Sequence, residues 1–450
     1  MQSTLAEPSQ IRDRLVQKML GRFRAALPLY KDMMDVADTI NRQAGDDVAE
    51  SLGRVMHAAI RCASTEELRT VARLFRLMGL EPVNYYDLRE KVAVESTAFR
   101  SIDQQDIRAN GFRMFCSVLA IDCIAEEHRP FVQSIIDRRA VFAPHLVSLL
   151  EQGEAEGGLD EESAELFVDL CVELFTRPED ALVSLDEYER LREINKVAAQ
   201  VLVSNALAIN HLTPSVASVP RAHEEMRLRG IKTIPVWQGP VGRDVILRQT
   251  SCLAPATLLR FPNADGTFTK AEHQETFVEF EERQQALTRE GRILFERLYA
   301  SGKASLSLAE TDPGFESHYY EVMRAALEPF PGDAIELWKR GLAYIENEVV
   351  REQGEAASLE EAIETGLVRL VPQKYEDFFG PAATNIFYSN IGLEGVANVG
   401  GAKPDSVVDF EARLGAQVLD MYDYYDGIER LSRESVSAAL GLSGGTGAPS

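Results

Sequence analysis

The chain lacks the residue patterns of several large protein classes. Its 450 residues include only five cysteines and seven histidines, and no two cysteines form a Cys-x-x-Cys pair. A small, odd-numbered and scattered set of cysteines predicts reduced thiols rather than a disulfide framework. The sequence also has no His-Glu-x-x-His segment and no glycine-rich phosphate loop ending in Lys-Ser/Thr. These absences argue against a zinc protease and a P-loop nucleotide hydrolase.

Basic residues are scarce relative to acidic ones, with 47 Lys and Arg against 71 Asp and Glu. The resulting net charge of −24 argues against nucleic acid as a partner, because phosphate binding requires a basic surface. A small anionic substrate needs only a few local arginines and stays open. The first ten residues lack the apolar core of a signal peptide, and apolar runs such as 114–124 are shorter than a membrane span. We therefore expect a cytoplasmic protein with no membrane partner.

Hydrophobic periodicity divides the chain into six expected parts. Two of them begin with a histidine-bearing strand followed by a helix and further strands, a repetition that indicates an internal duplication. In chain order we expect a helical N-terminal layer (1–50), a first metal-binding module (51–105), a helical insertion (106–207), a second metal-binding module (208–285), a helical region (286–441) containing a loop at 370–405, and a disordered tail (442–450).

Two of the histidines occur at the edge of expected strands. His57 begins the string HAAIR, and Arg61 lies four residues later, on the same face of either a strand or a helix. This pair is consistent with a metal ligand beside an anion-binding arginine, since a guanidinium can bind a carboxylate through two hydrogen bonds. His211 precedes Leu-Thr-Pro, whose proline ends any helix. The alternative for each histidine is a buried core residue with a hydrogen-bond partner.

A third segment, FVEFEER at 277–283, places Glu279 and Glu281 on one face of an expected strand. Carboxylates facing a core are costly unless they bind a metal or pair with an arginine such as Arg283 or Arg248. The alternative is an edge strand whose carboxylates face solvent. Two histidines and a carboxylate are the ingredients of the facial triad that binds non-haem Fe(II) and leaves coordination positions open.

Several strings together resemble one enzyme family. They are HAAIR, YYDL followed by STAFR, NGFRMF, NHLTP, IKTIP, LRQTS, FVEFEER and YEDF, and they span about residues 50–390. In this order they resemble the 2-oxoadipate dioxygenase/decarboxylase (2-hydroxyglutarate synthase) family, iron enzymes built on a vicinal-oxygen-chelate core. The string FVEFEER is also similar to the Phe-x-Glu-Ile-x-Gln-Arg strand of 4-hydroxyphenylpyruvate dioxygenase.

The resemblance implies a fold and a metal site. The fold would be α+β, with a vicinal-oxygen-chelate-like twisted sheet of two βαβ-type modules around the metal and large helical insertions. The metal would be Fe(II), with His57, His211 and Glu279 as its ligands. By the same resemblance Arg61 would be the catalytic arginine that anchors a substrate carboxylate.

The resemblance also implies a reaction, the oxidative decarboxylation of a 2-oxo acid by O₂ with hydroxylation of the shortened acid. In this reaction 2-oxoadipate would give 2-hydroxyglutarate and CO₂. A substrate with two carboxylates needs a second anchor, for which Arg248 and Arg100 are candidates beside Arg61. The loop after YEDF contributes to the substrate pocket in the family, so Pro381 and Ala382 are candidate substrate contacts.

The chain departs from the family pattern in two places. Glu95 replaces the usual histidine before Ser-Thr-Ala-Phe-Arg, and the loop after YEDF reads FGPAATNIF where the family tends to read LPVSAAGIF. Three functions therefore stay open beside the main hypothesis: the same chemistry on another 2-oxo acid, a glyoxalase-type isomerase or lyase with Glu281 as a base, and a binding protein without tight iron. The sequence does not predict an oligomeric state.

Overall fold

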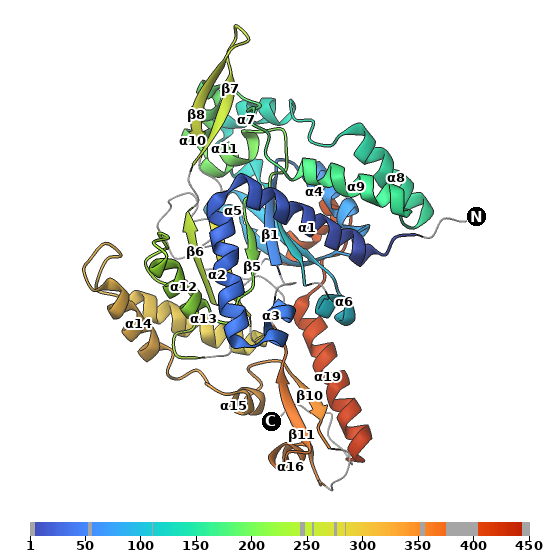
Figure 1. Cartoon of the computed structure of the whole chain (residues 1–450), viewed down its shortest axis with the longest axis vertical. Coiled ribbons are helices and arrows are strands. Elements are labelled where there is room, and N and C mark those ends of the chain that lie inside the picture. The colour runs from blue at the N-terminus through green and yellow to red at the C-terminus, as the bar shows by residue number, and fades with distance from the viewer. Residues whose placement is uncertain are drawn as a thin grey trace. The chain divides into compact units, whose positions relative to one another are not determined.

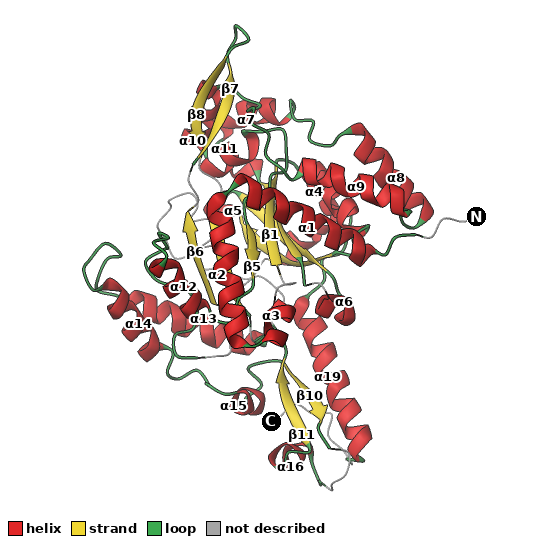
Figure 2. Cartoon of the chain, viewed as in Figure 1, coloured by secondary structure: helices red, strands yellow, loops and turns green. Residues whose placement is uncertain are grey.

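The computed structural model is an α+β protein whose chain divides into two compact units (Figures 1 and 2). The first unit comprises Met1–Lys232, Ser251–Phe280 and Phe378–Leu419, and the second comprises Thr233–Thr250, Glu281–Asp377 and Asp420–Ser450. None of the described helices is both long and apolar enough to cross a membrane. The structure describes residues 5–52, 56–109, 111–243, 248–253, 256–273, 277–283, 285–351, 356–374 and 404–442.

Three helices form the expected N-terminal layer: α1 (Pro8–Ala26), α2 (Pro28–Ala44) and α3 (Asp46–Leu52). A proline occupies the first position of both α1 and α2, where its missing N–H sacrifices no helical hydrogen bond. One side of α1 is buried, as the periodicity predicted. Its buried residues are Ile11, Arg12, Leu15, Val16, Met19 and Leu20.

A five-stranded sheet lies at the centre of the first unit, in the order β2-β3-β4-β1-β5. Strand β1 runs parallel to β4, and the other neighbouring pairs are antiparallel. Because successive side chains of a strand point to opposite faces, the register gives the sheet one apolar and one polar face. The strands are β1 (Met56–Cys62), β2 (Glu81–Leu88), β3 (Val94–Arg100), β4 (Arg113–Leu119) and β5 (Leu212–Pro214).

Helix α4 (Thr65–Arg76) covers the apolar face, where the ring of Phe75 lies 5.1 Å from that of Phe99 on β3. The sequence Ser64-x-x-Glu67 is a capping-box pattern, which predicts a helix start after Ser64, and the helix begins there. The hydroxyl of Ser64 accepts the N–H of Glu67, and the carboxylate of Glu67 accepts the N–H of the residue before Ser64. This cap joins the start of α4 to the end of β1.

The expectation of a helical insertion over 106–207 is wrong near its start, because β4 lies there between β1 and β3. All seven residues of β4 are buried, so its sequence reads as an apolar run that periodicity cannot distinguish from a helix. The other elements up to residue 207 are helical. They are α5 (Arg89–Val92) before β3, α6 (Gln104–Ala109), the 3₁₀ helices η1 (Ile121–Cys123) and η2 (Glu126–His128), α7 (Arg129–Ile136), α8 (Pro144–Glu156), α9 (Glu161–Leu174), α10 (Leu185–Ile194) and α11 (Lys196–Leu202).

The predicted second module, 208–285, is divided between the two units. Its expected helix is present. The sequence pattern also predicts a strand over 230–237, but the described structure has no strand there, and the hairpin of β7 and β8 was not predicted. Strands β6 and β9 pair as a separate two-stranded sheet. The elements are α12 (Val219–Leu228), β6 (Arg248–Leu253), β7 (Thr257–Pro262), β8 (Phe268–His273) and β9 (Phe277–Glu282).

The second unit contains an antiparallel strand pair that the helical expectation for 286–441 does not include. These strands are only five residues long, so their alternation is too brief to stand out. Helix α19 packs on β10, with Tyr344 and Tyr425 at a ring separation of 5.4 Å. The elements are α13 (Arg289–Ala304), α14 (Phe315–Ala326), α15 (Ala334–Lys339), β10 (Ile345–Val349), α16 (Leu359–Glu364), β11 (Val368–Pro372) and α19 (Met421–Leu440).

The sequence pattern predicts one helix over 407–431, where the structure has two, α18 (Pro404–Leu414) and α19. Gly415 ends α18 with a φ of 77°, and its N–H donates to the carbonyl oxygen of Glu411. A left-handed residue at this position favours glycine and terminates a helix. The break assigns α18 to the first unit and α19 to the second. Residues 443–450 of the expected tail lie outside the described residues.

A buried arginine ties the cap of α4 to the segment that leads towards residue 211. The side chain of Arg139 is 1% exposed, and its Nε donates to Glu67 Oε1 at 2.8 Å. Its Nη1 donates to the carbonyl oxygens of Val201 and Ser204 at 2.7 and 2.5 Å. One guanidinium therefore connects three segments of the first unit.

We expect Arg139→Met to lower the free energy of unfolding by about 3–5 kcal/mol, because Glu67 would keep a buried charge without its partner. Arg138→Met is the matched control, since Arg138 pairs with Glu187 at the surface and such pairs contribute about 1 kcal/mol or less. Urea unfolding measures both changes. Equal losses in the two variants would contradict a structural role for the buried pair.

Candidate metal centre

Three side chains from distant parts of the sequence meet in the first unit. His57, His211 and Glu279 each offer a ligand atom, and these atoms lie within 4.8 Å of one another. Nε2 of His57 is 3.6 Å from Oε2 of Glu279, and Nε2 of His211 is 4.0 Å from the same oxygen. All three residues are at most 3% exposed. Among the described residues, this is the one group of three or more His, Cys, Asp or Glu side chains that could hold a metal ion.

The strand pairing explains where these ligands lie. His57 is near the start of β1, directly opposite Thr213 of β5. His211 immediately precedes β5, and the residue before it donates its N–H to the carbonyl oxygen of Ala59 at 3.2 Å. The hydroxyl of Thr213 also donates a long hydrogen bond of 3.4 Å to Oε2 of Glu279, on β9. Thr213 thus links β5, which pairs with the strand of His57, to the carboxylate of Glu279.

The electrostatics of the group suit a divalent transition-metal ion. Burial, with smaller contributions from the neighbouring His57 and Arg61, lowers the pKa of His211 well below its ordinary value. A neutral imidazole keeps the lone pair that a metal needs. The two imidazole rings lie 5.2 Å apart at an angle of 80°, so they approach the shared space from different directions. Two nitrogen donors and one carboxylate fit the 2-His-1-carboxylate pattern.

The polar face of the sheet extends this site with buried cations and hydroxyls. Arg61 lies on the same face as His57, and burial lowers its pKa to about 10, so it stays charged at neutral pH. The hydroxyl of Ser96 donates to that of Ser117 at 2.9 Å. Arg113 and Ser117 were not among the predicted site residues, although they show the same four-residue spacing as His57 and Arg61. The buried polar residues that β3 and β4 contribute to this face are Ser96, Arg100, Arg113 and Ser117.

Other predicted site residues have different surroundings. Nε of Arg100 donates to the carbonyl oxygen of Ser101 at 3.0 Å. Arg248 belongs to the second unit, where its Nη1 donates to Oε1 of the buried Glu282 at 2.8 Å. Glu281 is also in the second unit, and its Oε1 forms an ion pair with Nε of Arg283 at a distance of 2.9 Å. Their substrate and base roles stay predictions. The candidate contacts Pro381 and Ala382 lie outside the described residues.

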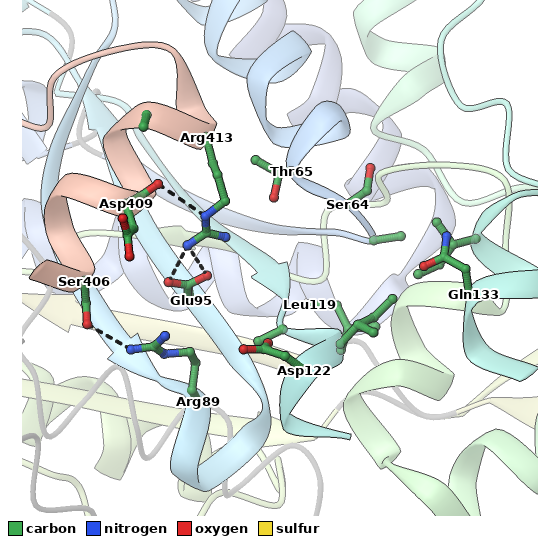
Figure 3. Close-up of a pocket in the computed structure, with 15 residues that line it drawn as sticks. Ser64, Thr65, Arg89, Glu95, Leu119, Asp122, Gln133, Ser406, Asp409 and Arg413 are labelled. Atoms are coloured by element: carbon green, nitrogen blue, oxygen red, sulfur yellow. Dashed lines mark hydrogen bonds and ion pairs between the residues drawn. The ribbon is translucent and has the colours of Figure 1, made fainter. Parts of the chain in front are cut away.

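Glu95 lies on the opposite face of the sheet from His57. Its carboxylate accepts hydrogen bonds from the hydroxyl of Tyr85 at 2.7 Å and from Nη2 of Arg413 at 2.8 Å. Glu95 and Arg413 line a hollow of about 650 Å³ between the start of α4, the end of β4 and α18 (Figure 3). Since none of the three ligands lines this hollow, the departure at Glu95 is explained by its ion pair rather than by the metal site.

Comparisons with known proteins agree with the geometry. The family model for 2-oxoadipate dioxygenase/decarboxylase matches residues 15–390. A protein of Pseudomonas putida named 2-oxoadipate dioxygenase/decarboxylase is 34% identical over 97% of this chain and 98% of its own. The chain belongs to the 2-oxoadipate dioxygenase/decarboxylase family. A relative of the same name in Escherichia coli (strain K12) is 31% identical over 94% of this chain and 97% of its own.

A solved structure of a family member has the same fold. The hydroxyglutarate synthase of Pseudomonas putida in complex with 2-oxoadipate matches with a TM-score of 0.86 at 31% identity, covering 97% of this chain and 99% of that one. The present chain is therefore an enzyme of the dioxygenase/decarboxylase type. The α+β fold and the family expected from the sequence are confirmed.

One further histidine, His273, is buried although the sequence gives no sign of it. His273 occurs in a polar stretch of the sequence, but it is 1% exposed in the structure. Its ring nitrogens contact Tyr188 and Arg177, far away in the sequence. No pattern in the sequence around His273 indicates these partners.

Proposed function

We propose that this chain is an Fe(II)-dependent dioxygenase that converts 2-oxoadipate and O₂ to 2-hydroxyglutarate and CO₂. The observation that carries the proposal is the buried group of His57, His211 and Glu279 in a member of this family. The reaction balances without an external reductant. Carbon 1 leaves as CO₂, one oxygen atom of O₂ enters the new carboxylate at carbon 2, and the other forms the hydroxyl group.

Each ligand would have a distinct part in holding Fe(II), which would supply open coordination positions and the oxidation chemistry. His57 and His211 would bind through their imidazole nitrogens, and Glu279 would contribute one negative charge. Thr213 orients the carboxylate of Glu279 through its hydroxyl group. Burial of all three ligands keeps bulk water away from the reacting groups.

Arg61 would bind a carboxylate of the substrate. Its guanidinium is buried and charged at neutral pH, and it shares a face of β1 with His57. A buried cation of this kind offsets the negative charge that a 2-oxo diacid brings into the site. The protein thus contributes position and charge, whereas the metal contributes the reactivity.

The same chemistry on another 2-oxo acid is the second candidate function. The sequence after YEDF favours it, because Pro381 and Ala382 replace a valine and a serine that the family often has there. Such a change would alter the tail of the substrate and leave the metal ligands untouched.

The protein loaded anaerobically with Fe(II) is expected to consume O₂ when 2-oxoadipate is added, and to form CO₂ and 2-hydroxyglutarate in equal amounts. An oxygen electrode with product analysis, applied to a panel of 2-oxo acids, measures this. Metal-free protein is the control. Oxygen uptake with a different 2-oxo acid alone would overturn the substrate assignment. Conversion of a 2-oxo aldehyde thiol adduct without O₂ uptake would instead support an isomerase.

A further inference from the structure

A buried cluster in the first unit has no part in the function proposed above. Arg177 follows α9, Tyr188 lies on α10 and His273 ends β8. Nη1 of Arg177 is 3.2 Å from Nε2 of His273, and the hydroxyl oxygen of Tyr188 is 2.7 Å from Nδ1. Tyr188 and His273 are buried, and Arg177 is partly buried. Three polar groups from distant segments therefore form one short chain of contacts.

The chemistry of these groups determines the proton positions. A guanidinium has only N–H donors, so Nε2 of His273 accepts from Arg177. The imidazole is then neutral, and its proton lies on Nδ1, which donates to the oxygen of Tyr188. Burial and the charges of nearby arginines, Arg177 first, lower the pKa of His273 to about 3. At neutral pH the imidazole therefore orients the guanidinium without adding positive charge.

Backbone hydrogen bonds connect this cluster with the polar face of the central sheet. Ile209 donates its N–H to the carbonyl oxygen of Phe175 at 3.0 Å, and the next residue donates to Ala59 at 3.2 Å. Phe175 is two residues before Arg177, and Ala59 is two residues before Arg61. Burial lowers the pKa of Arg177 to about 10, and electrostatic repulsion from Arg61 contributes a smaller part of this shift.

Both guanidiniums remain charged at neutral pH. Two like charges near each other inside a protein raise its energy, because little solvent screens them. An anion that contacts both cations removes this cost. Clusters of ionisable groups with perturbed pKa values are typical of functional sites. The pair therefore favours an anionic ligand.

We propose that Arg177, held in position by His273, acts together with Arg61 to bind the second carboxylate of a 2-oxo diacid. This assignment rests on the proposed function, which sets the 2-oxo end of the substrate at the metal. His57 and Arg61 are four residues apart on a strand, about 13 Å along its axis. An arginine side chain and a six-carbon diacid together span this distance. The site should consequently prefer diacids to monoacids of equal length.

The test compares 2-oxoadipate with 2-oxohexanoate, which has the same six carbons but no second carboxylate. Arg177→Met is expected to raise KM for 2-oxoadipate about ten- to a hundredfold, because this is the change in affinity that corresponds to the loss of one charge-assisted hydrogen bond. KM for 2-oxohexanoate should stay the same. Arg138→Met is the matched control, because Arg138 is an exposed arginine paired with Glu187 on α10. It should change neither constant.

His273 is a positioning residue in this proposal, and two substitutions separate that role from simple packing. His273→Gln keeps an acceptor for Arg177 and should retain most of the preference for the diacid. His273→Phe removes the acceptor and should raise KM for 2-oxoadipate while leaving 2-oxohexanoate unaffected. Circular dichroism and thermal melting check that each variant folds.

A binding measurement separates this inference from the proposed function. Calorimetry of 2-oxoadipate with the Zn(II)-loaded protein reports affinity without turnover. Weaker binding by Arg177→Met than by wild type upholds the inference, even if the Fe(II) protein does not turn the diacid over. Equal affinity in the two proteins overturns it, even if turnover of 2-oxoadipate is observed. An equal loss for the diacid and the monoacid also overturns it, because it would indicate a structural role alone.

Discussion

Alanine in place of His57, His211 or Glu279 is expected to abolish tight Fe(II) binding and oxygen uptake together. The wild-type chain should bind about one Fe(II), since one group of three ligands is present among the described residues. Changes to groups that only support a ligand cost about ten- to a hundredfold in metal affinity, so loss of a ligand should cost more. Metal analysis after dialysis and an oxygen electrode provide the two measurements.

Glu281→Ala is the matched control for metal binding. Glu281 lies two residues from Glu279 on β9, but its carboxylate pairs with Arg283 and is not part of the ligand group. This variant should keep its Fe(II). Full occupancy in Glu279→Ala combined with loss in Glu281→Ala would show that the other carboxylate is the ligand.

Arg61→Met is expected to keep Fe(II) and to raise KM for 2-oxoadipate about ten- to a hundredfold, because the substrate carboxylate loses a charge-assisted hydrogen bond. Arg61→Lys should recover only part of this loss, since an ammonium restores the charge without the two-pronged geometry. Steady-state kinetics with metal analysis distinguish this result from damage to the metal site.

Arg76→Met on α4 is the control for this substitution, because the side chain of Arg76 is 56% exposed and only a weak surface pair with Glu81 would be lost. Its kinetic constants should match those of wild type. Unchanged KM in Arg61→Met would remove Arg61 from the substrate site.

The elements that could be predicted from the sequence are those with a long or distinctive local pattern. The N-terminal helices show an apolar stripe over several turns, and the start of α4 follows from the Ser64–Glu67 pattern. Strand β4 was missed because it is buried on both faces and shows no alternation. The pair of β10 and β11 was missed because each strand is only five residues long.

The candidate ligands could be chosen from the sequence only with the help of the family resemblance. Composition and spacing left His57 and His211 as possible core residues, and left both Glu279 and Glu281 as possible ligands. The structure brings His57, His211 and Glu279 within reach of one ion. It also pairs Glu281 with Arg283, so that this buried carboxylate has a partner other than a metal ion.

The sequence by itself determined the family, the types of ligand and the local helices, because these depend on residue identity and short-range periodicity. Only the tertiary structure decided which side chains meet, because burial and contact depend on the pairing of strands distant in the chain. His57 faces Thr213 through the antiparallel register of β1 and β5, and Thr213 in turn contacts Glu279. Arg177 and His273 show the same principle, since their contact joins residues 96 positions apart that no local pattern connects.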